Sequence, residues 1–209
     1  MKKKIFLSII LTSFIIIMIN IAFNSQSSSI PTKIDYNYPS SFMIDNKNNF
    51  FDYQPGYECS AFSSSYVLRH YGYTDTGLKL FENFPSKLAD GGGVYPKGII
   101  TMFESRGFDA KMIKDATIDD LKQEISKGAP VIVYIHVEPN ADSVHYTHYV
   151  PIVGYDEEYF YFAESLPYKA NCKDQDLPYN RKTDIKTFKQ LWTNVEGIYE
   201  NPFFSISKK

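Results

Sequence analysis

A cysteine placed to act as a nucleophile is the feature of this chain that most strongly suggests chemistry. Cys59 ends the segment Tyr-Gln-Pro-Gly-Tyr-Glu-Cys, five residues after Gln54. From there to Tyr71, aromatic and apolar residues recur at helical spacing, and Gly72 is a typical C-terminal stop. Cys59 is therefore expected in the first turn of a helix. The positive end of the helix dipole favours the thiolate there, whereas an isolated cysteine is more often a small core residue.

The segment Thr147–Ser165 supplies the base that such a thiol needs. It is predicted to form two short strands joined by a turn at Asp156, with His148 opening the first and Glu164 closing the second. In an antiparallel pair the start of one strand lies beside the end of the next, so imidazole and carboxylate can meet. With Gln54 as oxyanion donor and Cys59 as nucleophile, the chain offers the groups required for thiol acyl transfer.

These residues resemble the papain-like cysteine peptidases, specifically the bacteriocin-leader (double-glycine) peptidases. The resemblance covers roughly residues 51–205, and the block His148–Asp156 is its most specific part. It implies an α+β fold in which N-terminal helices pack on a C-terminal antiparallel sheet. It also implies hydrolysis of peptide or amide bonds, without a cofactor or metal, by the catalytic residues Cys59, His148, Glu164 and Gln54.

Three departures separate the chain from the usual pattern of that family. The family spaces its glutamine six residues before the cysteine, follows the cysteine with glycine, and uses aspartate or asparagine as the third residue. Here Gln54 is five residues before, Ser60 follows, and Glu164 stands third, while Pro55 biases Gln54 towards an extended backbone. Two alternatives therefore stay open: a binding module that keeps the fold without turnover, and an acyl transferase or cell-wall amidase that uses the same residues.

Capping signals and periodicity predict the elements that must position these groups. Helices are expected from Pro96 to Gly107, from Thr117 to Gly128, and from Asp184 to Trp192, and strands over 130–137 and 198–206, the second broken at Pro202. Helices precede most of the sheet, which indicates the α+β class.

The N-terminus carries an export signal. Three lysines after Met1 precede an uncharged apolar run from Ile5 to Phe23, so residues 1–24 are predicted to be a signal peptide or an N-terminal membrane anchor. Residues 25–50 are polar and are assigned to a linker and lead-in, and residues 51–207 to the peptidase domain. The domain is thus expected outside the membrane, in the cell envelope or the extracellular space.

Composition limits the class of partner. The 209 residues include 17 Tyr and 16 Phe, which is enough apolar material for one domain with a sizeable core. There are 22 basic residues, three of them at the N-terminus, against 24 acidic ones, so the domain is not a nucleic-acid binder by charge. We expect a peptide or protein substrate, and membrane contact only through the N-terminal segment.

Two further patterns have competing interpretations. A disulfide between Cys59 and Cys172 would remove the nucleophile, and such bonds are common in exported proteins. A His-x-x-His pair at His145 and His148 has no third ligand at a metalloprotease spacing, so no metal is predicted. The glycines at 91–93 lack the lysine of a phosphate-binding loop and are interpreted as a flexible loop that could border the cleft.

Overall fold

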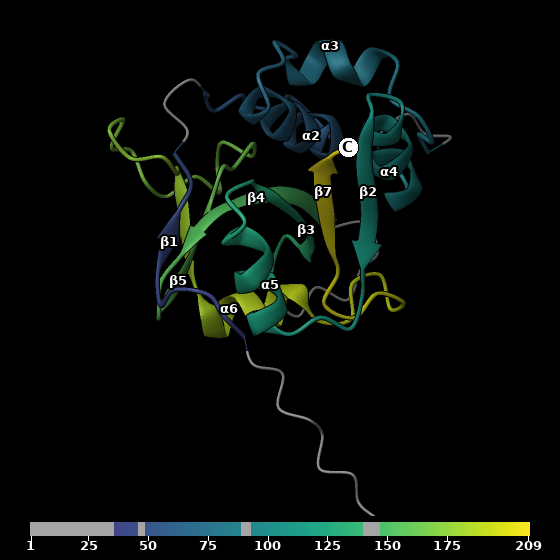
Figure 1. Cartoon of the computed structure of the whole chain (residues 1–209). Coiled ribbons are helices and arrows are strands. Elements are labelled where there is room, and N and C mark those ends of the chain that lie inside the picture. The colour runs from purple at the N-terminus through teal and green to yellow at the C-terminus, as the bar shows by residue number, and fades with distance from the viewer. Residues whose placement is uncertain (1–35, 46–48, 89–92, 140–146) are drawn as a thin grey trace, which may run out of the picture. The chain divides into compact units, whose positions relative to one another are not determined.

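The computed structural model describes residues 36–45, 49–88, 93–139 and 147–209 (Figure 1). In this part of the chain, helices pack on an antiparallel sheet of seven strands, which confirms the expected α+β class. The predicted signal or anchor segment, residues 1–24, lies outside the described residues. Among the described residues, no helix has the length and apolar character needed to cross a membrane.

The described helices are α2 (Cys59–His70), α3 (Gly77–Glu82), α4 (Pro96–Glu104), α5 (Ile118–Ile125) and α6 (Ile185–Trp192). The strands are β1 (Phe42–Met43), β2 (Phe108–Ile113), β3 (Val131–His136), β4 (Thr147–Tyr155), β5 (Tyr159–Phe162), β6 (Arg181–Asp184) and β7 (Phe203–Lys208). Along the sheet the strands follow the order β2-β7-β3-β4-β5-β6, and β1 pairs with β4.

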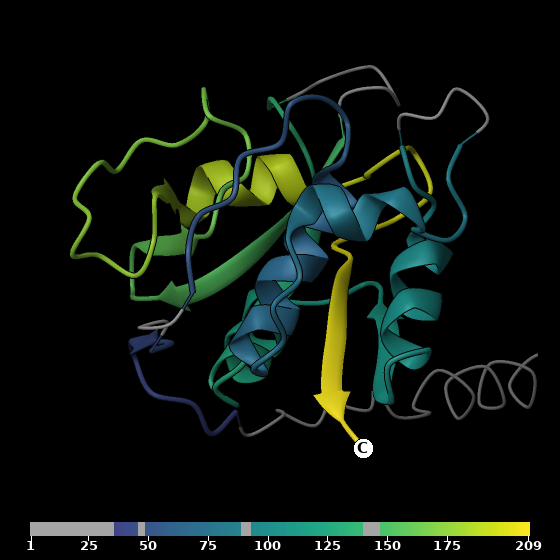
Figure 2. The same ribbon diagram turned by 90° about the horizontal axis from the view of Figure 1, so that it is seen from above.

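Helices cover both faces of the sheet, as Figures 1 and 2 show from two directions. The alternation of side chains along β3 sorts the core, because neighbouring residues of a strand point to opposite faces. Ile132 and Tyr134 pack with side chains of α2, α3 and α4, whereas Val133 and Ile135 pack with those of α5 and α6. All six residues of β3 are therefore buried, which makes it a central strand.

The helix starts predicted from sequence form, and those of α5 and α6 carry side-chain caps. At α5 the Thr117 hydroxyl accepts from Asp120 N at 3.1 Å while the Asp120 carboxylate accepts from Thr117 N at 2.8 Å, which is a complete capping box. At α6 the Asp184 carboxylate accepts from Thr187 N at 2.9 Å. Pro96 is the first residue of α4, where its missing N–H is harmless.

The closing strand is shorter than predicted. It was expected from residue 198, but β7 begins only at Phe203, after Pro202, which has no N–H to give to a ladder. The carbonyl of Pro202 is still used, since it accepts from Tyr134 N at 3.2 Å and from the Trp192 indole at 2.8 Å. The chain before it forms a turn closed by a bridge between Val195 and Tyr199.

Part of the lead-in packs against the domain. Strand β1 pairs with Gly154 and Tyr155 of β4, and the Tyr155 hydroxyl donates to Pro39 O at 3.0 Å. The Tyr36 hydroxyl donates to the Asp120 carboxylate at 3.1 Å. The folded unit therefore begins at about residue 36.

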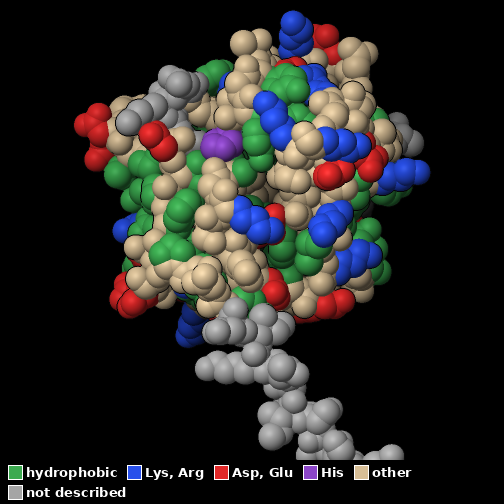
Figure 3. All heavy atoms as spheres, in the orientation of Figure 1, with side chains coloured by type: hydrophobic (Ala, Val, Ile, Leu, Met, Phe, Trp, Pro, Cys, Tyr) green, Lys and Arg blue, Asp and Glu red, His purple; other side chains and the backbone are tan. Residues whose placement is uncertain are grey.

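Charged side chains of both signs lie on the face drawn in Figure 3, with Lys and Arg most frequent on its right half. Lys and Arg side chains do not gather into an extended patch on this face, and Asp and Glu side chains lie among them. This face therefore carries charges of both signs, which agrees with the balance of charges in the sequence.

Candidate active site

Cys59 is the first residue of α2, as the sequence predicts. It is half-buried and packs against the core cluster that α2 forms with α4. The preceding residue, Glu58, gives no side-chain cap to the helix, because its carboxylate accepts from Gly56 N at 2.8 Å. The sulfur therefore lies at the positive end of a 12-residue helix whose first N–H groups are not used by a capping carboxylate.

Small residues on α2 bring that helix close to the strand that carries the base. Ser63, Ser64 and Ser65 are fully buried, and the Ser63 hydroxyl donates to Tyr149 O of β4 at 2.7 Å. Tyr149 follows His148 directly in the chain. This bond therefore fixes the start of β4 against the first turns of α2.

His148 lies near the start of β4, opposite Ile135 of β3, and only 2% of it is exposed. Its Nε2 donates to Glu164 Oε1 at 2.8 Å, which leaves Nδ1 for the Cys59 side chain. Burial lowers the pKa of the imidazole, but the Glu164 charge and hydrogen bonding to Cys59 and Glu164 outweigh it and raise the pKa to about 9. His148 can therefore hold a proton at neutral pH inside the protein.

Glu164 lies two residues beyond β5 and is 1% exposed. Its Oε1 also accepts from Leu166 N at 2.8 Å, and its Oε2 accepts from Arg181 at 2.7 Å. Burial raises the pKa of this carboxyl, but His148, Arg181 and the Leu166 N–H together lower it to about 2. The carboxylate is therefore ionised and has hydrogen-bond partners on both oxygens.

A bulge brings Glu164 into reach of the imidazole. The register between β4 and β5 shifts between Ile152 and Gly154, and beyond it Ala163 N donates to Pro151 O at 3.0 Å. Because β5 ends at Phe162, Glu164 follows that last pairing rather than closing the strand as predicted. The two side chains nonetheless meet across the hairpin, as the sequence pattern predicts.

Gln54 is buried beside the residue that follows Glu164 in the chain. Its backbone N–H donates to Ser165 O at 3.0 Å, and its side-chain oxygen accepts from the Ser165 hydroxyl at 2.7 Å. The side-chain nitrogen donates to Gly56 O at 2.6 Å. An amide nitrogen carries two hydrogens, and Gly56 O accepts one of them.

Other candidate residues have simpler roles. Cys59 and Cys172 are both free, so the disulfide alternative is not formed in this structure. Asp156 caps the hairpin turn: its carboxylate accepts from two backbone N–H groups and from the Tyr161 hydroxyl at 2.6 Å.

The remaining metal and phosphate patterns fall partly outside the described residues. His145 lies in the segment 140–146, and two of the glycines at 91–93 lie in the segment 89–92, neither of which the structure describes. Within the described ranges, no group of three His, Cys, Asp or Glu side chains is placed to hold a metal ion.

Two residues that the sequence did not indicate hold Glu164. The Asn180 side chain accepts from Glu164 N at 2.7 Å and donates to Glu164 O at 2.9 Å, and the Arg181 guanidinium binds the carboxylate. Both residues are buried. No motif marks them, because they follow the polar loop 167–179 and reach Glu164 only through the pairing of β5 with β6.

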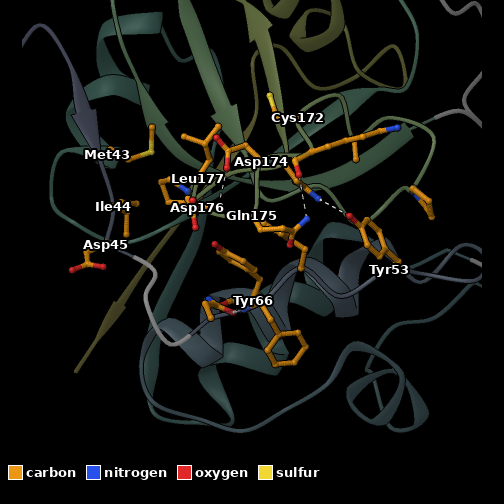
Figure 4. Close-up of a pocket in the computed structure, with 18 residues that line it drawn as sticks. Met43, Ile44, Asp45, Tyr53, Tyr66, Cys172, Asp174, Gln175, Asp176 and Leu177 are labelled. Atoms are coloured by element: carbon orange, nitrogen blue, oxygen red, sulfur yellow. Dashed lines mark hydrogen bonds between the residues drawn. The ribbon is translucent and has the colours of Figure 1, made fainter.

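A cavity of about 890 Å³ adjoins this region (Figure 4). The aromatic side chains of Tyr53 and Tyr66 lie on one side and the loop with Cys172, Asp174 and Asp176 on the other. Asn180 also lines it, so the cavity reaches the residue that holds the Glu164 backbone.

The comparison with protein families decides the class of this chain. Residues 39–199 match the model of the Peptidase_C39-like family. The chain belongs to this family. It is accordingly a cysteine peptidase, and the resemblance inferred from the Gln54–Cys59 and His148–Asp156 segments is confirmed at the level of the family.

Solved structures support the fold. A C39-like peptidase from Bacillus anthracis is 19% identical with a TM-score of 0.62, and the match covers 80% of this chain and 98% of that one. The interpain A cysteine protease of Prevotella intermedia is 14% identical with a TM-score of 0.50, over 81% of this chain and 95% of the other. No protein with a curated description matches the sequence.

Proposed function

We propose that this peptidase is an exported thiol hydrolase that cleaves peptide bonds through Cys59, His148 and Glu164, with Gln54 as oxyanion donor. The proposal rests on the buried bond between His148 Nε2 and Glu164 Oε1, which leaves the other ring nitrogen available for the thiol at the start of α2. In this arrangement the acid orients the base and the base deprotonates the nucleophile, which is how a thiol is activated.

In the first half of the reaction, the Cys59 thiolate adds to the carbonyl carbon and a C–S bond forms. The carbonyl oxygen becomes an oxyanion, which the Cys59 backbone N–H and the second hydrogen of the Gln54 amide stabilise. When the tetrahedral intermediate collapses, the C–N bond breaks and the His148 imidazolium donates its proton to the leaving amine. A thioester on Cys59 remains.

In the second half, neutral His148 takes a proton from water as the oxygen attacks the thioester carbon. The C–S bond then breaks, the acid product leaves, and the Cys59 thiolate is restored beside the imidazolium. Glu164 stays ionised throughout, because the Arg181 guanidinium and the Leu166 N–H bind it independently of His148.

The proposed place of action rests on the sequence. The three lysines followed by the apolar run from Ile5 to Phe23 favour export of all that follows. A cell-envelope or extracellular peptidase would meet peptides and proteins outside the cytoplasm, which are the substrates we propose.

A competition between the two cysteines tests the nucleophile. Iodoacetamide at pH 6 should label Cys59 much faster than Cys172, as measured by mass spectrometry of the digested protein. His148→Ala should bring the two rates together. Cys59→Ala should abolish peptide hydrolysis while the circular dichroism spectrum is kept, and Cys172→Ala is the matched control that should keep full activity. Turnover that persists in Cys59→Ala would overturn the proposal.

A further inference from the structure

We propose that Arg181 is a positioning residue for this peptidase: its guanidinium keeps the Glu164 carboxylate ionised and aimed at His148, while Asn180 holds the Glu164 backbone. The inference rests on the proposed function in taking His148 as the base. It explains how a glutamate, with one more methylene than aspartate, can be the orienting acid.

Glu164 needs external support because it has left the sheet. Strand β5 ends at Phe162, so the backbone of Glu164 has no strand partner on the β6 side. The Asn180 side chain replaces that partner, because it accepts from Glu164 N at 2.7 Å and donates to Glu164 O at 2.9 Å. The Asn180 backbone in turn is fixed by its N–H, which donates to Phe162 O at 3.2 Å.

Arg181 then fixes the side chain of the same residue. It opens β6 opposite Phe162, with its guanidinium carbon 5.1 Å from the centre of the Phe162 ring. Its Nη1 lies 2.7 Å from Glu164 Oε2, and the side chains of the two residues are 7% and 0% exposed. A buried carboxylate that lost such a partner would either take up a proton or turn away from His148.

The charges of the buried cluster balance only if Arg181 is counted. In the reactive state the thiolate of Cys59 and the carboxylate of Glu164 are negative, and the imidazolium of His148 and the guanidinium of Arg181 are positive. Tyr134 and Tyr149 also act on Cys59, and the Tyr134 hydroxyl binds the Glu196 carboxylate, but both phenols stay neutral because burial raises the pKa of each. The charge balance of the cluster is therefore set by Cys59, His148, Glu164 and Arg181. Without Arg181 the cluster would carry a net negative charge in a buried place, which favours the uptake of a proton.

The test uses Arg181→Met, which removes the charge but keeps an unbranched apolar side chain, and Arg181→Lys, which keeps the charge. Lys182→Met is the matched control, because Lys182 is the exposed neighbour on the same strand. At pH 6, Arg181→Met should slow the labelling of Cys59 by iodoacetamide at least about tenfold. Arg181→Lys should restore most of the rate, and Lys182→Met should match the wild type.

Labelling as a function of pH separates positioning from general damage. At about pH 9 and above, where free thiols ionise without help, the rates of all variants should converge. Equal rates in the wild type and Arg181→Met at pH 6 would overturn the inference, as would an equal loss at every pH, which a merely structural role would produce.

A second measurement does not depend on catalysis. Arg181→Met should lower the urea midpoint of unfolding most near pH 6, and the gap from the wild type should narrow towards pH 3, because the wild type there begins to lose the advantage of an ionised Glu164. If the difference in urea midpoint between the wild type and Arg181→Met were the same at every pH, Arg181 would not keep Glu164 ionised, even if Cys59 proves to be the nucleophile. Slow labelling of Cys59 in the wild type, together with a narrowing gap, would instead contradict the proposed function and leave the ion pair intact.

Discussion

The raised pKa of His148 predicts that the folded protein loses stability at alkaline pH. The folded-state pKa of about 9 lies above the ordinary value of 6.5, so the folded imidazole holds a proton that the unfolded imidazole has released. In the wild type this proton is offset by the one that Cys59 loses on becoming a thiolate, so the prediction is made for a Cys59→Ser background. The stabilisation is complete below about pH 6.5 and disappears as the pH rises through about 9. Between these values the free energy of unfolding of Cys59→Ser should fall by about 1.4 kcal/mol per pH unit, and by at most roughly 3 kcal/mol in all because Cys59 itself adds to the raised pKa.

Urea unfolding at half-unit steps from pH 5 to pH 10 measures this loss in Cys59→Ser, with His148→Gln added to it as the perturbation. An amide at position 148 can still bond Glu164 but has no proton to lose in this range, so the fall in the free energy of unfolding should vanish from its curve. His70→Gln is the control. Burial lowers the pKa of His70, so removing that side chain should leave the alkaline fall unchanged.

Parallel curves for Cys59→Ser and Cys59→Ser/His148→Gln between pH 6.5 and pH 9 would refute the reasoning. They would mean that the imidazole releases its proton equally easily in the folded and unfolded states. The bond to Glu164 would then add nothing to the basicity of His148, and the orienting acid would have to be sought elsewhere.

Two further predictions concern the oxyanion donor and the place of action. Gln54→Ala should lower kcat by roughly 10²–10³. Glu164→Gln should lower kcat by a smaller factor, because an amide can still accept the imidazole hydrogen bond. Steady-state kinetics on both variants measures these losses, and an unchanged kcat in Gln54→Ala would show that this residue is not the oxyanion donor. If residues from about 25 onward are exported, protease added to intact cells should degrade the domain, as detected by immunoblotting. If the domain is degraded only after the cells are lysed, the enzyme lies on the cytoplasmic side of the membrane.

Local signals predicted those elements whose ends are marked by caps. The first residue of α4, the capping box of α5 and the Asp184 cap of α6 depend on contacts within four residues, so the sequence shows them directly. The six-residue α3 is too short to show a period, and β6 consists of the polar residues Arg181–Asp184. Such a strand is recognised only when its partner, β5, is known.

The candidate site likewise contains residues with a local sequence signal and residues without one. Cys59 and His148 could be predicted because a helix start and a strand start each have a local signature. Glu164 followed from the geometry of the hairpin, although a bulge and two residues beyond the strand place it there. Asn180 and Arg181 act through tertiary contacts across 16 and 17 positions of the chain, which no spacing rule encodes.

Gly154, within the His148–Asp156 segment, has a structural role because it lets β1 pair with β4. A Cβ at position 154 would lie 2.6 Å from Met43 Sδ and 2.7 Å from Phe42 O, so any side chain there would push β1 off the sheet. A truncated fragment that starts at residue 51 would therefore keep Cys59 and His148 but leave the end of β4 uncovered. The end of β4, the strand that carries His148, would then have unpaired backbone groups that could pair with another copy of the protein. Recombinant versions of this enzyme should therefore begin no later than Tyr36.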